Sequence, residues 1–221
     1  MFVLPFTMSF GTMVKFSDFP IVPANKSSLS RRRPMYGIFV NDADYITSLS
    51  VDGKRITCPI FSRWKNMIIR CNDKKYHDKF PTYKDCTIDN QWHSFMSFRG
   101  WVLTQSDWEC CELDKDLLVD GNNIYGPQFC IFISPHINTF FAHNTRRLSS
   151  DSLGVFFHRG NWYARCGGES LKRYYSPPFD LRGDAVLWYQ NKRKELAYVL
   201  AAKQTNPIIA NAIIRKVDGG A

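Results

Sequence analysis

The chain lacks the features that mark membrane-spanning and secreted proteins. It contains no uninterrupted apolar run of about 18 residues, the length that a membrane-spanning helix needs, so no membrane partner is expected. A secretory signal begins with basic residues, but here Lys15 is the first cation and follows the apolar start of the chain. We therefore expect an intracellular protein.

The chain also lacks the cysteine spacing of a disulfide framework or a zinc ribbon. Its seven cysteines are an odd number, and no C-x-x-C sequence occurs. We expect reduced, mostly buried thiols and interpret the adjacent Cys110 and Cys111 as incidental. A scattered zinc site built from Cys71, Cys86 and Cys130 stays open as an alternative.

The net charge is +9, and it is unevenly placed. Residues 1–34 carry five Lys/Arg and one Asp, residues 35–150 carry thirteen residues of each sign, and residues 151–221 carry eleven basic and six acidic residues. A neutral segment therefore lies between two positive ones. This distribution indicates a polyanionic partner, and the alternative is that the charge only aids solubility.

The length of 221 residues and the 44% hydrophobic content suit one medium or two small globular domains. Residues 1–34 are rich in turn-forming residues and end in Arg31–Pro34, which predicts a basic N-terminal extension or linker. Its arginines either grip phosphates or form a solvated tail, and Met35 is an alternative start. We expect that deletion of residues 1–34 leaves folding intact.

Hydrophobic spacing predicts an α+β fold in two modules. Residues 35–150 contain a hairpin turn at 51–54, helical spacing over 59–71 and 89–102, a second hairpin around 120–123, and a helix that starts at Pro135. Residues 151–221 contain three short strands near 153–157, 162–166 and 172–175, then a helix over about 184–202 and a last short helix from Pro207. The aromatic residues of 89–102 are expected to be core.

Five stretches of the second module form a recognisable pattern: Leu153–Phe157, Asn161–Arg165, Arg173–Tyr175, Phe179–Asp180 and Ala185–Tyr189. This pattern resembles the DNA-binding domain of plant ethylene-response factors, which also occurs at the C-terminus of phage homing endonucleases. It implies a three-stranded antiparallel sheet that enters the major groove and is backed by one helix. The DNA contacts that it implies are Arg159, Trp162, Arg165, Lys172 and Arg173.

Strand alternation separates two of these residues. It places Trp162 with Ala164 and Cys166 on one face, and Arg165 with Tyr163 on the other. Trp162 and Arg165 therefore do not share a face of a regular strand, and we interpret Arg165 as the safer DNA contact.

Three stretches of the first module also form a recognisable pattern: Trp64–Cys71, Pro81–Cys86 and Leu113–Asn138. They are similar to phage HNH (His-Me finger) endonucleases, in which a histidine activates water beside one divalent metal on a ββα frame. Together the two resemblances cover about residues 35–204. They imply a degenerate ββα-metal (HNH-like) module, and a location in the host cytoplasm if a phage encodes the chain.

The chain departs from the HNH pattern where the chemistry matters most. Lys115 stands in the general-base position, and a charged ammonium neither accepts a proton nor binds a metal. The remaining candidates are Asp114, Asp116 and Asn138 as ligands of Mg²⁺ or Mn²⁺, and His136 or His143 as a displaced base. Lys115 could instead clamp a phosphate, and the two aspartates could simply be a charged edge beside a turn.

These observations predict a protein that binds double-stranded DNA. The first hypothesis is a metal-dependent homing-type endonuclease or nickase that uses Asp114, Lys115, Asp116, His136 and Asn138. The second is a non-catalytic DNA-binding protein in which the HNH-like frame only grips the backbone. The third is a phage accessory factor that binds a host protein.

Overall fold

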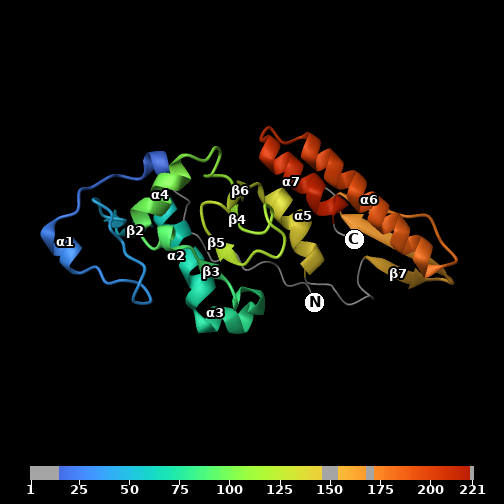
Figure 1. The fold of residues 1–221 in the computed structure, drawn as a ribbon, viewed down its shortest axis with the longest axis horizontal. Helices are drawn as coiled ribbons and strands as arrows, with labels where there is room; N and C mark the ends of the chain where they lie inside the picture. The colour runs from blue at the N-terminus through green and yellow to red at the C-terminus, as the bar shows by residue number, and fades with distance from the viewer. Residues whose placement is uncertain (1–14, 146–153, 168–171, 220–221) are drawn as a thin grey trace. The chain divides into compact units, whose positions relative to one another are not determined.

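The computed structural model describes residues 15–145, 154–167 and 172–219 of the chain (Figure 1). The fold is mixed α+β, as predicted, with helices and small, mainly antiparallel sheets. Two compact units divide it. The first comprises the described residues up to Glu109 together with Asn123–Phe129, and the second comprises Cys110–Asn122 and the described residues from Cys130 onward.

The first unit is mainly helical. Its 3-10 turns are η1 (Phe16–Asp18), η2 (Pro81–Tyr83) and η3 (Asn90–Trp92), and its helices are α1 (Lys26–Ser30), α2 (Pro59–Asn72), α3 (Lys74–Lys79) and α4 (Phe95–Leu103). Strands β1 (Ser48–Val51) and β2 (Lys54–Thr57) form the predicted hairpin, and β3 (Thr87–Ile88) pairs in parallel with β5 (Ile124–Tyr125).

Helix α2 confirms the prediction over 59–71. Pro59 occupies its first turn, where a backbone N–H is not needed, and its apolar spacing buries one stripe of side chains. The predicted single helix over 89–102 is wrong, because two caps divide it. Asp89 accepts a hydrogen bond from the Gln91 N–H and begins η3, and Ser94 accepts one from the Ser97 N–H and begins α4.

Aromatic side chains form the core of the first unit, as predicted. Trp64, Trp92, Phe95 and Phe98 are fully buried. The Trp64 Nε1–H donates to the Trp92 carbonyl oxygen at 2.8 Å, which satisfies the one polar group that this indole would otherwise bury unpaired. These residues are therefore packing residues and not a platform for stacking bases.

Residues 15–34 pack as part of the first unit, which differs from the predicted extension. Phe19 is only 3% exposed and its ring lies 6.4 Å from that of Tyr45. The Arg32 guanidinium donates to the carbonyl oxygens of Asn41, Ala43 and Tyr45. This arginine holds a loop of the protein in place, so it is committed to an internal structural role.

The second unit begins with a strand, a strand and a helix in that order. Strand β4 (Glu112–Asp114) pairs antiparallel with β6 (Ile131–Ile133), and α5 (Pro135–Thr145) follows β6. Glu112 lies opposite Ile133 and Asp114 opposite Ile131. The predicted helix from Pro135 is present and packs on β4. The hairpin predicted around 120–123 differs from the structure, because β5, the strand that follows this turn, pairs with β3, and β4 pairs with the later β6.

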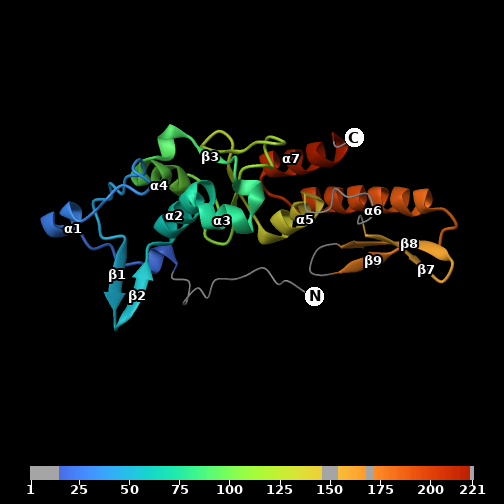
Figure 2. The same ribbon diagram turned by 90° about the horizontal axis from the view of Figure 1, so that it is seen from below.

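The predicted three-stranded sheet is also present. Strands β7 (Val155–His158), β8 (Asn161–Gly167) and β9 (Arg173–Tyr175) are antiparallel, with β8 in the centre. Helix α6 (Arg182–Ala202) packs along one face of this sheet, against β8 and β7 (Figure 2). Helix α7 (Pro207–Asp218) then packs on α6.

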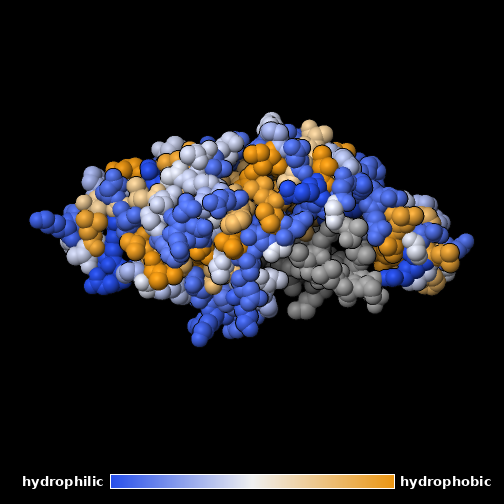
Figure 3. Space-filling view, in the orientation of Figure 1, coloured by the Kyte–Doolittle hydropathy of each residue, from blue (hydrophilic) through white to orange (hydrophobic). Residues whose placement is uncertain are grey.

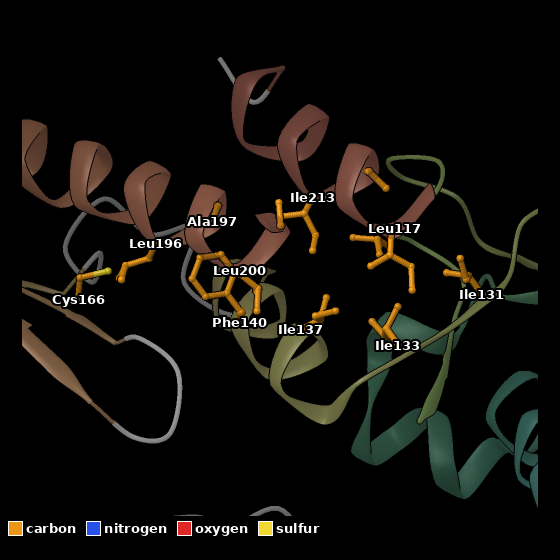
Figure 4. Close-up of a cluster of buried hydrophobic side chains, with 13 residues drawn as sticks. Leu117, Ile131, Ile133, Ile137, Phe140, Cys166, Leu196, Ala197, Leu200 and Ile213 are labelled. Atoms are coloured by element: carbon orange, nitrogen blue, oxygen red, sulfur yellow. The ribbon is translucent and has the colours of Figure 1, made fainter. Parts of the chain in front are cut away.

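One hydrophobic cluster joins the elements of the second unit (Figure 4). Ile133 of β6 and Ile137 and Phe140 of α5 lie with Leu200 of α6 and Ile213 of α7 in this cluster. The boundaries of the two observed units therefore differ from those of the predicted modules, residues 35–150 and 151–221. Apolar side chains of β6 and α5 are buried by the C-terminal helices, which sequence spacing alone does not specify.

Candidate functional site

The two faces of the β7–β8–β9 sheet differ in their surroundings. On β8, Ala164 and Cys166 are buried beneath α6, whereas Arg165 between them is exposed. This alternation follows from the two-residue period of a strand and agrees with the faces that the sequence predicted. One face therefore belongs to the core of the unit, and no described helix of the same unit packs on the other.

We call this second face the open sheet face, and it combines arginines with aromatic rings. Its members follow from the strand register: Phe156, His158, Tyr163, Arg165, Arg173 and Tyr175. The rings of Phe156 and Tyr163 stack with centroids 5.8 Å apart and an angle of 17°. Tyr175 is 60% exposed and lies directly across from Arg165, which is also exposed.

The open sheet face carries positive charge without a compensating carboxylate in its strands. The described residues of β7, β8 and β9 include Arg165 and Arg173 but no Asp or Glu. Arg159 extends this charge to the end of the sheet, in the exposed β7–β8 turn, where its φ is 49° and that of Gly160 is 84°. Such a surface suits a polyanion with exposed apolar groups, as DNA bases and phosphates present.

Two of the predicted DNA contacts lie away from the open sheet face. Trp162 points to the same side as Ala164, with its ring 5.1 Å from that of Phe157 and 5.9 Å from the Arg182 guanidinium. The Lys172 ammonium lies 5.0 Å from the ring centroid of Tyr174, and Lys192 of α6 lies 4.6 Å from the same ring. Tyr174 pairs with the buried Cys166, so Lys172 is drawn toward the helix-covered side.

Gly154, the residue before β7, supports the backbone of Arg165, a role that the sequence reasoning missed. The Arg165 N–H donates to the Gly154 carbonyl oxygen at 2.8 Å. Gly154 has a φ of +75°, and a Cβ at this position would lie 2.3 Å from the Arg165 carbonyl oxygen. Only glycine fits this approach without a shift of the backbone. A glycine just before a β-strand is the signal that could have indicated it.

The candidate metal ligand Asp114 is engaged by the backbone of its own loop. Its Oδ1 accepts hydrogen bonds from the N–H groups of Asp116, at 2.9 Å, and Leu117, at 2.7 Å. Burial raises the pKa of the Asp114 carboxyl above its usual range, and these two hydrogen bonds oppose that rise. The carboxylate therefore organises the turn that follows β4.

Lys115 is held as a cation in the same loop. Its side chain is only 11% exposed, and its Nζ donates to Asp116 Oδ1 and, at 2.8 Å, to the Asn122 carbonyl oxygen. The Asn122 side chain donates back to the Lys115 carbonyl oxygen at 2.8 Å. Both acceptors favour the charged ammonium, so this geometry supports neither a general base nor a metal ligand at Lys115.

The helix side of the candidate site presents an amide and an exposed histidine. The Asn138 side-chain amide of α5 donates to Glu112 Oε2 of β4. The Glu112 carboxylate thus links β4 to α5, a role that the sequence reasoning did not predict. His136 is exposed in the first turn of α5, and the side chain of His143 lies outside the described residues.

In the described structure, each candidate metal ligand is bonded to another group of the chain. Asp116 is paired with an ammonium, Asp114 caps backbone groups, and Asn138 is bonded to Glu112, whereas Mg²⁺ requires several oxygen ligands directed at one point. Nowhere in the described ranges do three His, Cys, Asp or Glu side chains come together as a metal site requires, which also leaves the zinc alternative at Cys71, Cys86 and Cys130 without support.

No protein-family model, curated protein or solved structure matches this chain. Within the described ranges, no helix has both the length and the apolar character that crossing a bilayer requires. The exposed arginines of the open sheet face contrast with the carboxylates of the β4 loop, which are bonded within the chain.

Proposed function

We propose that this protein binds double-stranded DNA through the open sheet face. The observation that carries the proposal is the placement of exposed Arg165 and Arg173 beside exposed Tyr175 on a sheet face that no described helix of its unit covers. A narrow antiparallel sheet fits the major groove, which is about 12 Å wide. The resemblance to the ethylene-response-factor domain supports the same mode of binding.

The residues of the open sheet face divide naturally between two kinds of contact. Arg165 lies on the central strand, where a guanidinium can donate two hydrogen bonds to guanine O6 and N7. Arg159 lies in the turn at the end of the sheet, a position that suits a phosphate contact. Tyr175 offers an apolar ring to the methyl group of thymine.

In this proposal the ββα segment of β4, β6 and α5 supports binding without hydrolysis. Asp114 accepts hydrogen bonds from backbone N–H groups, and Asp116 accepts one from the Lys115 ammonium. A second candidate is metal-dependent nicking by an HNH-like centre. The observation that favours it is the ββα order itself, with Asn138 of the helix beside Glu112 of the first strand.

One experiment separates the two candidates. The purified full chain is incubated with supercoiled plasmid in Mg²⁺ or Mn²⁺ and in EDTA, and retardation and nicking are read from the same gel. We expect retarded, intact plasmid under all three conditions. Nicking that requires the metal and disappears in the Asp114→Ala/Asp116→Ala variant would instead establish the HNH-like activity. No retardation of any duplex would contradict the proposed DNA binding.

A further inference from the structure

Residues 35–150 are neutral in total, but their positive and negative charges lie in separate stretches of the sequence. Residues 60–84 contain seven Lys/Arg and two Asp, a net charge of +5, whereas residues 85–123 contain two Lys/Arg and eight Asp/Glu, a net charge of −6. The positive part covers α2, α3 and η2 of the first unit. Of the seven cations, Lys65, Lys74, Lys75, Lys79 and Lys84 are exposed, whereas Arg63 and Arg70 are not, so the positive charge that this part of the first unit exposes comes from lysines.

Four of these exposed lysines lie in a short folded segment, residues 73–84, which we call the lysine segment. Asp73 begins α3 by accepting a hydrogen bond from the Tyr76 N–H at 2.8 Å. The Tyr76 ring then packs against Phe80, with centroids 4.8 Å apart, and against Tyr83 of η2, at 5.6 Å. This aromatic cluster gives α3 and η2 a fixed structure of their own.

The lysines of this segment lie on its outside. Lys74, Lys75 and Lys84 are exposed, and Figure 3 shows a hydrophilic surface over α3. Within the described residues, none of these three lysines forms an ion pair. By contrast, Lys194 and Lys216 of the second unit pair with Asp218 and Asp120. An external anion can thus bind the three lysines without displacing an internal carboxylate.

The surface chemistry of the segment favours a phosphate backbone over other acidic partners. None of the exposed large hydrophobic residues of the described chain falls within residues 60–84. A membrane-binding segment needs apolar side chains to insert, and a protein interface needs an apolar core. Phosphate contacts need only accessible cations on a defined support.

We infer that the lysine segment is a second nucleic-acid contact, in which Lys74, Lys75 and Lys84 bind the sugar–phosphate backbone. This inference goes beyond the binding by the open sheet face and does not depend on it, because the lysines belong to a different unit. The contact is independent of sequence and adds affinity that falls as salt rises.

The test uses the full chain with the Lys74→Gln/Lys75→Gln/Lys84→Gln variant and a 30-base-pair duplex. The control variant, Lys15→Gln/Lys26→Gln/Lys54→Gln, removes the same charge from three exposed lysines elsewhere on the first unit. Affinity is measured by fluorescence anisotropy over a salt titration. Affinity falls as salt rises, and each lost phosphate contact makes the slope of log affinity against log salt shallower by about 0.9. We therefore expect the slope of the first variant to be shallower than that of wild type by about 2.7. We expect little change in the control.

A second readout distinguishes a direct contact of these lysines with the duplex from an effect of the substitutions on folding or on net charge. Acetylation of lysines, read by mass spectrometry with and without the duplex, should show protection of Lys74, Lys75 and Lys84 in the wild-type chain, and far-ultraviolet circular dichroism should be the same for all variants. Equal losses of affinity in the two triple variants, or no protection of these lysines, would overturn the inference.

The remaining outcomes distinguish this inference from the proposed function. If the Lys variant binds like wild type while Arg165→Ala/Arg173→Ala binds weakly, the inference fails and the open sheet face stands. The reverse result retains the lysine segment and rejects the sheet. Vesicles of phosphatidylserine and phosphatidylcholine form a third arm, and lysine-dependent binding to vesicles but not to the duplex would overturn the inference in favour of a membrane surface.

Discussion

The replacement of Arg165 by alanine is the sharpest test of the open sheet face. Arg165 is exposed at the centre of the sheet, between Gly154, which has no side chain, and Tyr175. If the open sheet face binds DNA as proposed, this substitution removes the only guanidinium that the described part of the central strand β8 presents. The backbone bond from the Arg165 N–H to Gly154 does not involve the side chain, so the strand should remain intact in Arg165→Ala.

The expected loss follows from the chemistry of one guanidinium. A base contact or a well-defined phosphate contact of this kind is worth about 1–3 kcal/mol, so affinity should fall by about 5- to 150-fold. The measurement is fluorescence anisotropy with a duplex chosen by selection from a random pool, at one fixed salt concentration. The melting temperature of the variant should stay close to that of wild type.

Lys172→Ala provides a matched control in the same sheet. It also removes one positive charge, but its ammonium lies over Tyr174 on the helix-covered side. We therefore expect a smaller loss of affinity than for Arg165→Ala. A loss at Lys172 that equals or exceeds the loss at Arg165, with both variants folded, would refute the assignment of the open face as the DNA interface.

Three further predictions concern stability. Phe19→Ala should lower the free energy of unfolding by about 3–5 kcal/mol, as measured by urea denaturation, because Phe19 is buried. An unchanged denaturation midpoint would instead support the prediction that residues 1–34 are a linker. Gly154→Ala should lower the melting temperature and weaken DNA binding, since its Cβ would collide with the Arg165 carbonyl oxygen, whereas Gly167→Ala, which meets no atom, should do neither. Burial raises the pKa of Asp114 in the folded state, so the protonated carboxyl contributes to the free energy of unfolding. This contribution is fully present below the pKa of the unfolded chain and is lost as pH rises through the pKa of the folded protein. Asp114→Asn should therefore flatten the pH profile of the melting temperature and raise that temperature at neutral pH; a lower value there would show that the charge is needed.

The sequence predicted those elements whose pattern is local. The apolar stripe of α2 and the turn at 51–54 need only neighbouring residues to specify them, and both are present. The same is true of β8, where the two-residue period alone placed Arg165 opposite Ala164 and Cys166. The single helix predicted over 89–102 was wrong because apolar spacing does not indicate that the side chain of Ser94 caps a new helix after η3.

By itself, then, the amino-acid sequence determined the α+β class, the sheet with its backing helix, and the face on which Arg165 lies. The tertiary structure decided what periodicity does not encode. Phe19 became core through Tyr45, which is 26 residues away, Lys172 was drawn to the helix side by Tyr174, and Asp114 was taken up by the backbone of its own turn. Each of these outcomes depends on a partner that only the folded chain brings within reach, and burial and hydrogen bonding follow from such partners rather than from residue type.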